Sequence, residues 1–341
     1  MKKVTIADVA QHAGVSKSTV SQYLNHRYEY MREETKNRIE ESIKTLEYRP
    51  NIVARSLKQK STTTIGVIVA NILHTFSTQV IRAIEDTCQD ADFHTIVCNA
   101  DDNPEKERKY IEMLRAKQVD GIILLPTGDN VNLYNEMLKE GYPIVFVDRT
   151  VPDVEIPSML LDNEKASGIG VQHLIDMGYK KIGIITNVIR NVTPRMERIN
   201  GYKNTMTANG LDVRDDYIKS REVNRIKEGV HELLSLNDPP EAILAGNDLT
   251  LIEILKYVKE NHMKIPEDIA IIGIDDVSFA SFYEPGLTIV AQPTFEIGKK
   301  AAEFLLNTIQ KKEDQEKGLV VRFDPKLIIR ESCKRKDVIH E

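Results

Sequence analysis

The stretch TIADVAQHAGVSKSTVSQYLN, residues 5–25, decides the fold of the first part of the chain. Its apolar residues recur at the three- and four-residue spacing of an amphipathic helix until Gly14 interrupts the pattern. They are Ile6, Val9, Ala10 and Ala13. Gly14 permits a tight turn with positive φ, and Ser16 is a favourable N-cap for a second helix with Val20 on its inner face. The order helix, glycine turn, helix predicts a helix-turn-helix.

The segment around this stretch is basic, although the whole chain of 341 residues carries a net charge of -6. Up to Lys60, twelve Lys and Arg face seven Asp and Glu, a net of +5. The remaining 281 residues hold 34 basic and 45 acidic side chains, a net of −11. A third helix is expected to turn Ile39, Ile43 and Leu46 inward. This division of charge indicates that residues 1–60 form a nucleic-acid-binding headpiece. The negative net charge of the whole chain, taken alone, argues against a nucleic-acid partner.

The second helix would enter the major groove of DNA by its N-terminal end. Lys17 can donate to guanine, Gln22 can bond adenine or the backbone, and Ser18 faces outward with them. Short polar side chains elsewhere in the segment suit phosphate oxygens. These are Thr5, Ser16, Thr19, Ser21 and Asn25. A solvated three-helix face with ordinary Ser and Lys content is the alternative.

Residues 51–58, after Pro50, have helical propensity over only about two turns, and so short a helix is marginal in water. DNA or a partner copy would have to stabilise it. Leu57 would be an exposed apolar side chain flanked by Arg55 and Lys58, which suits a wedge in the minor groove with Arg55 as a further DNA contact. A flexible interdomain linker is the alternative.

Residues 5–25, followed by RPNIVARSLK at residues 49–58, resemble the headpiece and hinge helix of the LacI/GalR family of bacterial transcriptional regulators. The likeness extends through essentially the whole chain. It implies that Leu57 intercalates at the centre of a palindromic operator, with Asn51 and Ala54 beside it. One position departs from the family pattern: Arg32 stands where a serine usually caps the third helix. The preceding loop, residues 26–30, is aromatic and somewhat long.

From residue 64 onward, short β-branched runs alternate with amphipathic segments. The runs are TIGVIVA (64–70), HTIVCN (94–99), DGIILL (120–125), PIVFVD (143–148), KIGIIT (181–186), EAILA (241–245) and IAIIGID (269–275). Continuous apolar strands separated by helices indicate parallel sheets covered on both faces. Two such series predict two doubly wound α/β subdomains.

The resemblance implies that these subdomains form a clamshell like that of periplasmic binding proteins. Its chain would cross between them near residues 161, 291 and 321. The expected effector-binding and dimerisation domain is therefore residues 61–341. Its N-subdomain would take about 61–161 plus 292–320, and its C-subdomain about 162–291 plus 321–331.

Parallel sheets place ligand sites at the carboxyl ends of their strands, so polar residues after the strands form a candidate effector pocket. They are His74, Phe76, Asp148, Arg149, Arg195, Arg198, Asn247, Asp275 and Gln292. Carboxylates, amides and guanidinium groups with one aromatic ring suit a hydroxylated and anionic small molecule. The resemblance implies pocket roles for Arg198, Asn247 and Asp275, and contact of Asp148 with sugar hydroxyls. Capping of a strand or turn is the alternative role for Asp275.

Other classes of protein lack support in the sequence. The three cysteines show no CxxC pairing, and the histidines show no metal-ligand spacing, so no metal is expected. Walker, GxSxG and HExxH motifs are absent, so neither an enzyme nor a cofactor is expected. Asp8, Gln11 and His12 interrupt any apolar signal region, and no apolar run is long enough for a membrane span. A cytoplasmic protein without a membrane partner is expected.

Together with the family resemblance, these patterns imply a ligand-responsive repressor of carbohydrate catabolism genes that binds a palindromic operator as a homodimer. Val80, Ile81 and Ile84 are candidate dimer contacts. Similarity to repressors of pectin and hexuronate catabolism implies 2-keto-3-deoxygluconate as the effector, with neutral sugars and nucleosides as competitors. A sugar-binding transport protein or a sugar-modifying enzyme with the same clamshell is the alternative, but neither explains the basic helix-turn-helix.

Overall fold

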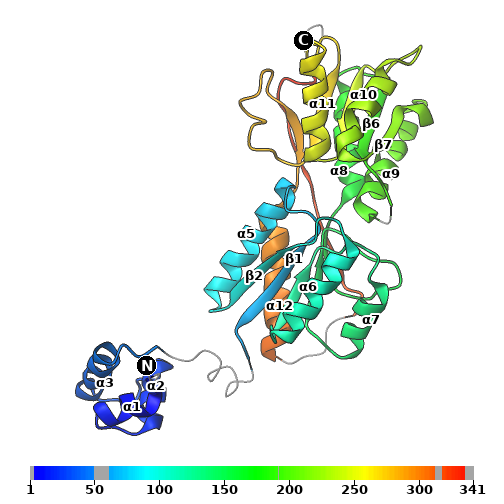
Figure 1. Ribbon diagram of the computed structural model, residues 1–341. Helices are drawn as coiled ribbons and strands as arrows, with labels where there is room; N and C mark the ends of the chain where they lie inside the picture. The colour runs from blue at the N-terminus through cyan, green and yellow to red at the C-terminus, as the bar shows by residue number, and fades with distance from the viewer. Residues whose placement is uncertain (1–3, 50–60, 191, 312–316, 335–341) are drawn as a thin grey trace. The chain divides into compact units, whose positions relative to one another are not determined.

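The computed structural model describes residues 4–49, 61–190, 192–311 and 317–334 (Figure 1). The chain divides into two compact units, Met1–Thr62 and Thr63–Glu341, which we call the headpiece and the body. The expected hinge contacts lie outside the described residues. They are Asn51, Ala54, Arg55 and Leu57.

Within residues 4–49 the headpiece consists of helices α1 (Ile6–His12), α2 (Lys17–Leu24) and α3 (Glu33–Thr45). Their inner faces bury a small apolar core made of Val9, Ala10, Ala13, Val20 and Ile39. Gly14 has a φ of 64°, as the turn between α1 and α2 requires. The Ser16 hydroxyl caps α2 by accepting a hydrogen bond from the backbone N–H of Thr19 at 3.2 Å. The predicted helix-turn-helix is confirmed.

The first lobe of the body, which we call the N-lobe, has a parallel sheet with the strand order β11-β5-β4-β3-β1-β2. The strands are β1 (Thr64–Val69), β2 (His94–Asn99), β3 (Gly121–Leu124), β4 (Ile144–Val147), β5 (Ser158–Leu161) and β11 (Val320–Phe323). Helices α5 (Thr75–Asp90) and α12 (Thr294–Lys311) pack together on one face. Helices α6 (Pro104–Ala116) and α7 (Val131–Lys139) cover the other face (Figure 1).

The second lobe, the C-lobe, has the strand order β12-β10-β9-β8-β6-β7, in which only β12 is antiparallel to its neighbour among the described strands. The strands are β6 (Ile182–Asn187), β7 (Ile218–Arg221), β8 (Ala242–Ala245), β9 (Ala270–Ile274), β10 (Thr288–Ala291) and β12 (Lys326–Ile328). Helices α8 (Asn163–Asp176) and α9 (Thr193–Ala208) cover one face. Helices α10 (Ile226–Leu234) and α11 (Asp248–Glu260) cover the other. The expected fold class is confirmed.

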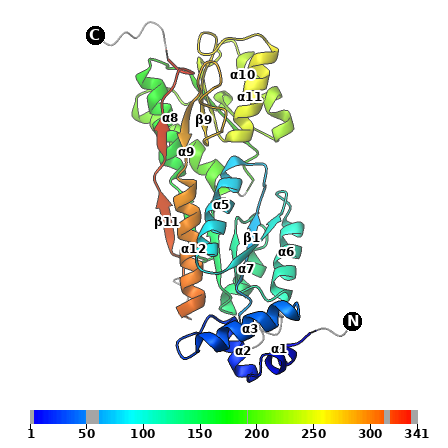
Figure 2. The ribbon, with the colours of Figure 1, turned by 90° about the vertical axis from the view of Figure 1, so that its left-hand side faces the viewer.

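The two sheets repeat one strand order, so β4 of the N-lobe occupies the same place as β9 of the C-lobe. The chain passes between the lobes after β5, after β10 and after β11. The third passage follows Phe323, because β11 still pairs in parallel with β5 in the N-lobe sheet. It therefore comes slightly later than the expected position near residue 321, and β11 and β12 run on from one lobe to the other (Figure 2).

Two of the candidate dimer contacts were wrong. Val80 and Ile84 on α5 are fully buried in the N-lobe core, where they pack with Ile297 and Ala301 of α12. Ile81 is partly buried against the same core. The apolar face of α5 is used inside the lobe, because α12, distant in sequence, covers it.

Candidate functional site

Helix α2 presents the side chains that were predicted to read DNA. Lys17, Ser18 and Gln22 are exposed, whereas Val20 between them is fully buried and fixes the face that α2 turns outward. The Ser16 hydroxyl lies 2.6 Å from that of Ser18 and 2.8 Å from that of Thr19. The start of α2 is therefore a cluster of hydroxyl groups beside a lysine, which suits phosphate oxygens and base edges.

The other predicted phosphate contacts have local partners. The Thr5 hydroxyl donates to Asp8 Oδ2 at 2.7 Å, which helps to close the first turn of α1. The Asn25 amide donates to the carbonyl of Ser21 at 2.6 Å, at the end of α2. Asn25 and Ser21 are half-buried, so they contribute to the end of the helix as well as to its polar surface.

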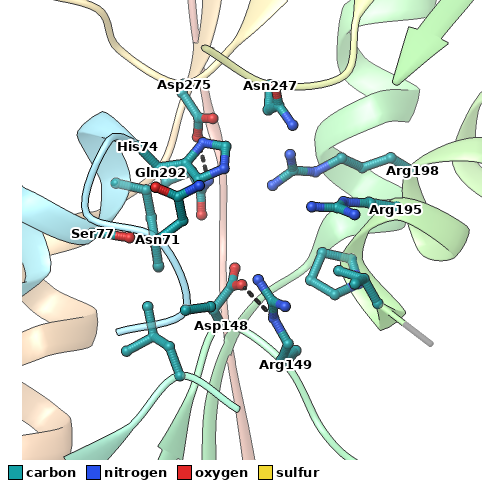
Figure 3. Close-up of a pocket in the computed structure, with 15 residues that line it drawn as sticks. Asn71, His74, Ser77, Asp148, Arg149, Arg195, Arg198, Asn247, Asp275 and Gln292 are labelled. Atoms are coloured by element: carbon teal, nitrogen blue, oxygen red, sulfur yellow. Dashed lines mark hydrogen bonds and ion pairs between the residues drawn. The ribbon is translucent and has the colours of Figure 1, made fainter. Parts of the chain in front are cut away.

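A pocket lies between the two lobes of the body, at the carboxyl ends of strands from both sheets (Figure 3). All nine predicted effector residues line it. They are His74, Phe76, Asp148, Arg149, Arg195, Arg198, Asn247, Asp275 and Gln292. This follows from the topology, because the carboxyl ends of parallel strands meet at one edge of each sheet and the two edges face each other.

Two aspartates stand at equivalent places in the two lobes. Asp148 follows β4 and Asp275 follows β9, and both have a left-handed backbone, with φ values of 74° and 88°. Such backbone is costly for residues other than glycine and tends to occur at functional sites. Burial raises the pKa of Asp275, and the charge of neighbouring Asp248 raises it further. One carboxyl group from each lobe therefore faces the pocket as a hydrogen-bonding group.

The three arginines of the pocket differ in their partners. Arg149 Nε donates to Asp148 Oδ2 at 3.0 Å, which balances its charge. Arg198 is buried and donates to Asn163 Oδ1 at 2.8 Å and to the carbonyl of Gly246 at 2.5 Å. Arg195 donates to the carbonyl of Val188, and it forms no ion pair with a carboxylate of the described residues.

Arg195 is half-buried and stays charged. Burial and the charge of Arg149 lower the pKa of Arg195 to about 10, well above neutral pH. In the close-up, the guanidinium groups of Arg195 and Arg198 point into the pocket from the same side (Figure 3). This side of the pocket therefore suits an anionic group, since guanidinium pairs well with carboxylate or phosphate.

Beside the pocket the two lobes are joined by hydrogen bonds between His74 and Thr75 of the N-lobe and Asp248 of the C-lobe, which we call the clasp. Asp248 accepts hydrogen bonds from His74 Nδ1 and from the backbone N–H of Thr75, both at 2.6 Å. Since Thr75 begins α5, the carboxylate sits at the positive end of that helix. Burial by itself lowers the pKa of His74, but the hydrogen bond and charge of Asp248 outweigh burial and raise it. The pKa of Asp248 is lowered, because its bonds to His74 and to backbone N–H groups outweigh burial.

Gln292 supplies an unused acceptor in the pocket wall. Its amide nitrogen donates to Asp275, whereas its buried oxygen has no hydrogen-bond partner among the described residues. A ligand hydroxyl is the natural donor for this oxygen. Carboxylate and amide acceptors, guanidinium donors and the Phe76 ring together suit a polyhydroxylated ligand with one anionic group.

Some of the site was not predicted. Val192 and Pro194, at the start of α9, line the pocket beside Arg195, but apolar residues there carry no chemical signal in the sequence. The role of Asp248 in joining the lobes was also missed, although the residue stands next to Asn247. The described residues contain no group of three or more His, Cys, Asp or Glu side chains that could hold a metal ion. Among the described helices, none is long and apolar enough to cross a membrane.

Family comparisons match nearly the whole chain. Residues 5–51 match the family described as bacterial regulatory proteins, lacI family. Residues 62–331 match the family described as periplasmic binding proteins and sugar binding domain of LacI family.

Individual relatives agree with this match. The probable HTH-type transcriptional regulator EndR of Paenibacillus polymyxa is 48% identical over 332 residues, which is 96% of this chain and 98% of EndR. The HTH-type transcriptional regulator KdgR of Bacillus subtilis is 33% identical and covers 96% of this chain and 97% of its own. A crystal structure of the Lac repressor dimer bound to operator and an anti-inducer matches with a TM-score of 0.84 at 24% sequence identity. The match covers 98% of this chain and 100% of the Lac repressor chain, and it supports the fold.

Proposed function

The chain belongs to the LacI family of bacterial regulatory proteins, and from this we propose that it is a homodimeric repressor that binds a palindromic operator. Binding of a sugar or sugar acid in the pocket would either weaken or strengthen its binding to the operator. The helix-turn-helix with its exposed Lys17, Ser18 and Gln22 would read each half-site. The pocket between the lobes would bind the effector. A cytoplasmic location follows from this role, and the protein would leave its ligand chemically unchanged.

The effector that we propose is a carboxylated sugar. Arg195 carries this proposal, because it is a charged, half-buried pocket residue without a carboxylate ion-pair partner among the described residues. A ligand carboxylate would balance that charge, while Asp148, Asp275 and the Gln292 oxygen would accept hydrogen bonds from hydroxyl groups. We propose 2-keto-3-deoxygluconate as the first compound to test.

A thermal-shift panel of neutral sugars, nucleosides and sugar acids on the full-length protein tests the effector. A compound that binds the native protein raises the unfolding temperature in proportion to ln(1 + [L]/Kd). We expect stabilisation by one or more sugar acids, with the compound recovered intact after incubation. Stabilisation by neutral sugars only would refute the carboxylate proposal but not the repressor proposal.

Footprinting of the DNA upstream of candidate target genes tests whether the protein binds a palindromic operator. We expect a protected palindrome, and its absence with and without each panel compound would refute the repressor proposal. Leu57, which lies outside the described residues, is proposed as a minor-groove wedge at the centre of the operator. Leu57→Gly should then weaken operator binding more than nonspecific binding, and equal losses would refute the wedge.

A further inference from the structure

A chain of hydrogen bonds leads from the pocket to β11, the edge strand of the N-lobe sheet. It starts at Arg198 of α9, whose Nε donates to Asn163 Oδ1 at 2.8 Å. Asn163 Nδ2 then donates to Glu197 Oε2 at 3.1 Å. Glu197 also accepts two hydrogen bonds from Arg322 of β11, at 2.8 and 3.2 Å. We call these four residues the relay, and within it Arg198 is the residue that lines the pocket.

The Asn163 amide is held in one orientation. Its side chain is buried, and its nitrogen donates to two acceptors, the carbonyl of Leu161 at 3.2 Å and the carboxylate of Glu197. The amide oxygen therefore faces Nε of Arg198. If the amide turned over, its oxygen would face two acceptors and Arg198 would lose a hydrogen-bond partner. Glu197 thus determines which end of this amide the pocket arginine meets.

The relay fixes the guanidinium group of Arg198. A guanidinium is planar and has five N–H donors. Two of its nitrogens donate within the protein, Nε to Asn163 and a terminal nitrogen to the carbonyl of Gly246. A planar group held at two nitrogens is restrained from rotating, so its other N–H donors keep one direction. Arg198 points into the pocket, where a ligand can accept from these donors (Figure 3).

One link of the relay joins the two lobes. Asn163, Glu197 and Arg198 lie on α8 and α9 of the C-lobe, whereas Arg322 lies in the N-lobe sheet. Arg322 and Glu197 form a bidentate ion pair, which has a more defined geometry than a pair made by lysine. An exposed ion pair contributes little to stability by itself. This pair differs because it continues into the buried amide of Asn163.

The link lies beside two passages of the chain between the lobes. Strand β5 ends at Leu161 and β11 ends at Phe323, and a passage follows each strand. The backbone N–H of Asp162 donates to the carbonyl of Phe323 at 2.9 Å, which joins the two passages. A rotation of one lobe against the other turns the chain here. It therefore changes the distance between Arg322 and Glu197.

We propose that Arg322 and Glu197 are positioning residues of the effector pocket, which hold Arg198 in its ligand-binding orientation while β11 lies beside α9. They act through the amide of Asn163. This proposal rests on the proposed effector-binding function, and it adds how the angle between the lobes sets the affinity of the pocket. By linkage, a ligand bound to Arg198 favours the arrangement of the lobes in which the relay is intact.

Nuclear magnetic resonance of the full-length protein, made with isotope-labelled arginine, tests the relay without a ligand. The exchange rate of Arg198 Nε–H with water is measured, and its resonance is identified by its loss in Arg198→Lys. Arg322→Met keeps the length of the side chain but has no donor. We expect this variant to speed exchange at Arg198 about fivefold, the change for one net hydrogen bond. Equal exchange in wild type and Arg322→Met would overturn the proposal.

Two controls accompany this measurement. The Nε–H of Arg149 donates to Asp148 outside the relay, so its exchange should stay the same in Arg322→Met. Arg190→Met removes an exposed ion pair with Glu222, and it should leave the exchange at Arg198 unchanged. Faster exchange at Arg149 by the same factor would show a general loosening of the pocket and would overturn the proposal.

Titration calorimetry with 2-keto-3-deoxygluconate separates positioning from a merely structural role. Arg322→Met should weaken binding about fivefold in the wild-type background, for the same loss of one hydrogen bond. In an Asn163→Ala background the relay is already broken, so Arg322→Met should have no further effect. Equal losses in both backgrounds would overturn the proposal. Failure of this compound to bind wild type would refute only the proposed effector, and the exchange rates would still decide whether the relay holds Arg198.

Discussion

At the residue scale, the proposed carboxylated ligand depends on Arg195. Replacing it with Gln should weaken binding of a sugar acid about 10- to 100-fold, because a hydrogen bond to a charged group contributes about 1.5–3 kcal/mol. Binding of neutral sugars should change little. Isothermal titration calorimetry measures both, with Arg190→Gln as the control, since Arg190 is an exposed arginine paired with Glu222. Equal losses for charged and neutral ligands would contradict this role.

His74 should make stability depend on pH. Its pKa is raised above the usual 6.5, so the native state binds the proton more tightly than the unfolded state does. The stability from the protonated pair with Asp248 is fully present below pH 6.5 and is lost as the pH rises through the higher native pKa. Urea unfolding of the body should thus show a free energy that declines above about pH 6.5. His74→Gln should remove that decline, and an unchanged pH dependence would count against the clasp.

The chemical types in the pocket were predictable from the sequence, but their pairing was not. Asp148 and Asn247 follow strands β4 and β8, and Arg198 lies on α9, the helix after β6; strand ends converge by topology alone. Whether an arginine finds a carboxylate depends on side-chain geometry at the meeting of the two lobes. Arg149 finds Asp148, whereas Arg195 does not, and no spacing in the sequence separates these two cases.

At the scale of elements, the contact between α8 and α9 depends on Gly201. A Cβ atom at Gly201 would lie 2.2 Å from the backbone oxygen of Glu164, so the two helices would have to separate. Gly201→Ala should lower the free energy of unfolding by about 2–3 kcal/mol, as overpacking does. Chemical denaturation measures this change.

Gly229 is the control for this prediction. Its nearest neighbour would be the flexible stem of Arg221, at 3.2 Å, and it lies inside helix α10. Gly229→Ala should be neutral or stabilising, because alanine favours a helix by about 1 kcal/mol over glycine. Similar losses in both variants would show that the close approach at Gly201 is not the cause.

Seven of the described strands were predicted as apolar runs, among them the edge strand β2, whereas β5, β7, β10, β11 and β12 were not. Runs such as IAIIGID are continuous and apolar because both faces of those strands are covered. Strands β7, with the sequence IKSR, and β12, with KLI, lie at sheet edges and carry polar residues, which are half-buried in β7 and exposed at Lys326 in β12. The apolar face of α5 was wrongly predicted to contact a partner subunit. From the sequence, this face could pack either against another helix of the same chain or against a partner, and in the structure it packs against α12.

At the scale of the whole molecule, the exposed apolar residues of the body favour a dimer. Phe282 is 74% exposed in the segment before β10, and Leu73 is 73% exposed just before α5. We expect Phe282→Asp to shift the protein from dimer to monomer in analytical ultracentrifugation and to weaken operator binding, since two half-sites need two headpieces. Sugar-acid binding by the monomer should persist because the pocket belongs to one chain. An unchanged dimer would place the interface elsewhere.

The order of the chain has a consequence during synthesis. Residues 6–45 contain all three described helices of the headpiece. The two sheets of the body are complete only after β11 and β12 have been synthesised, and β12 ends at Ile328. At about 5–20 residues per second, the ribosome needs roughly 15 to 60 seconds to cover that interval. All residues of the three headpiece helices are thus synthesised before the body is complete and before the chain can dimerise through it. We expect a headpiece at this stage to contact only one half-site, so that repression begins only after the body has folded and dimerised.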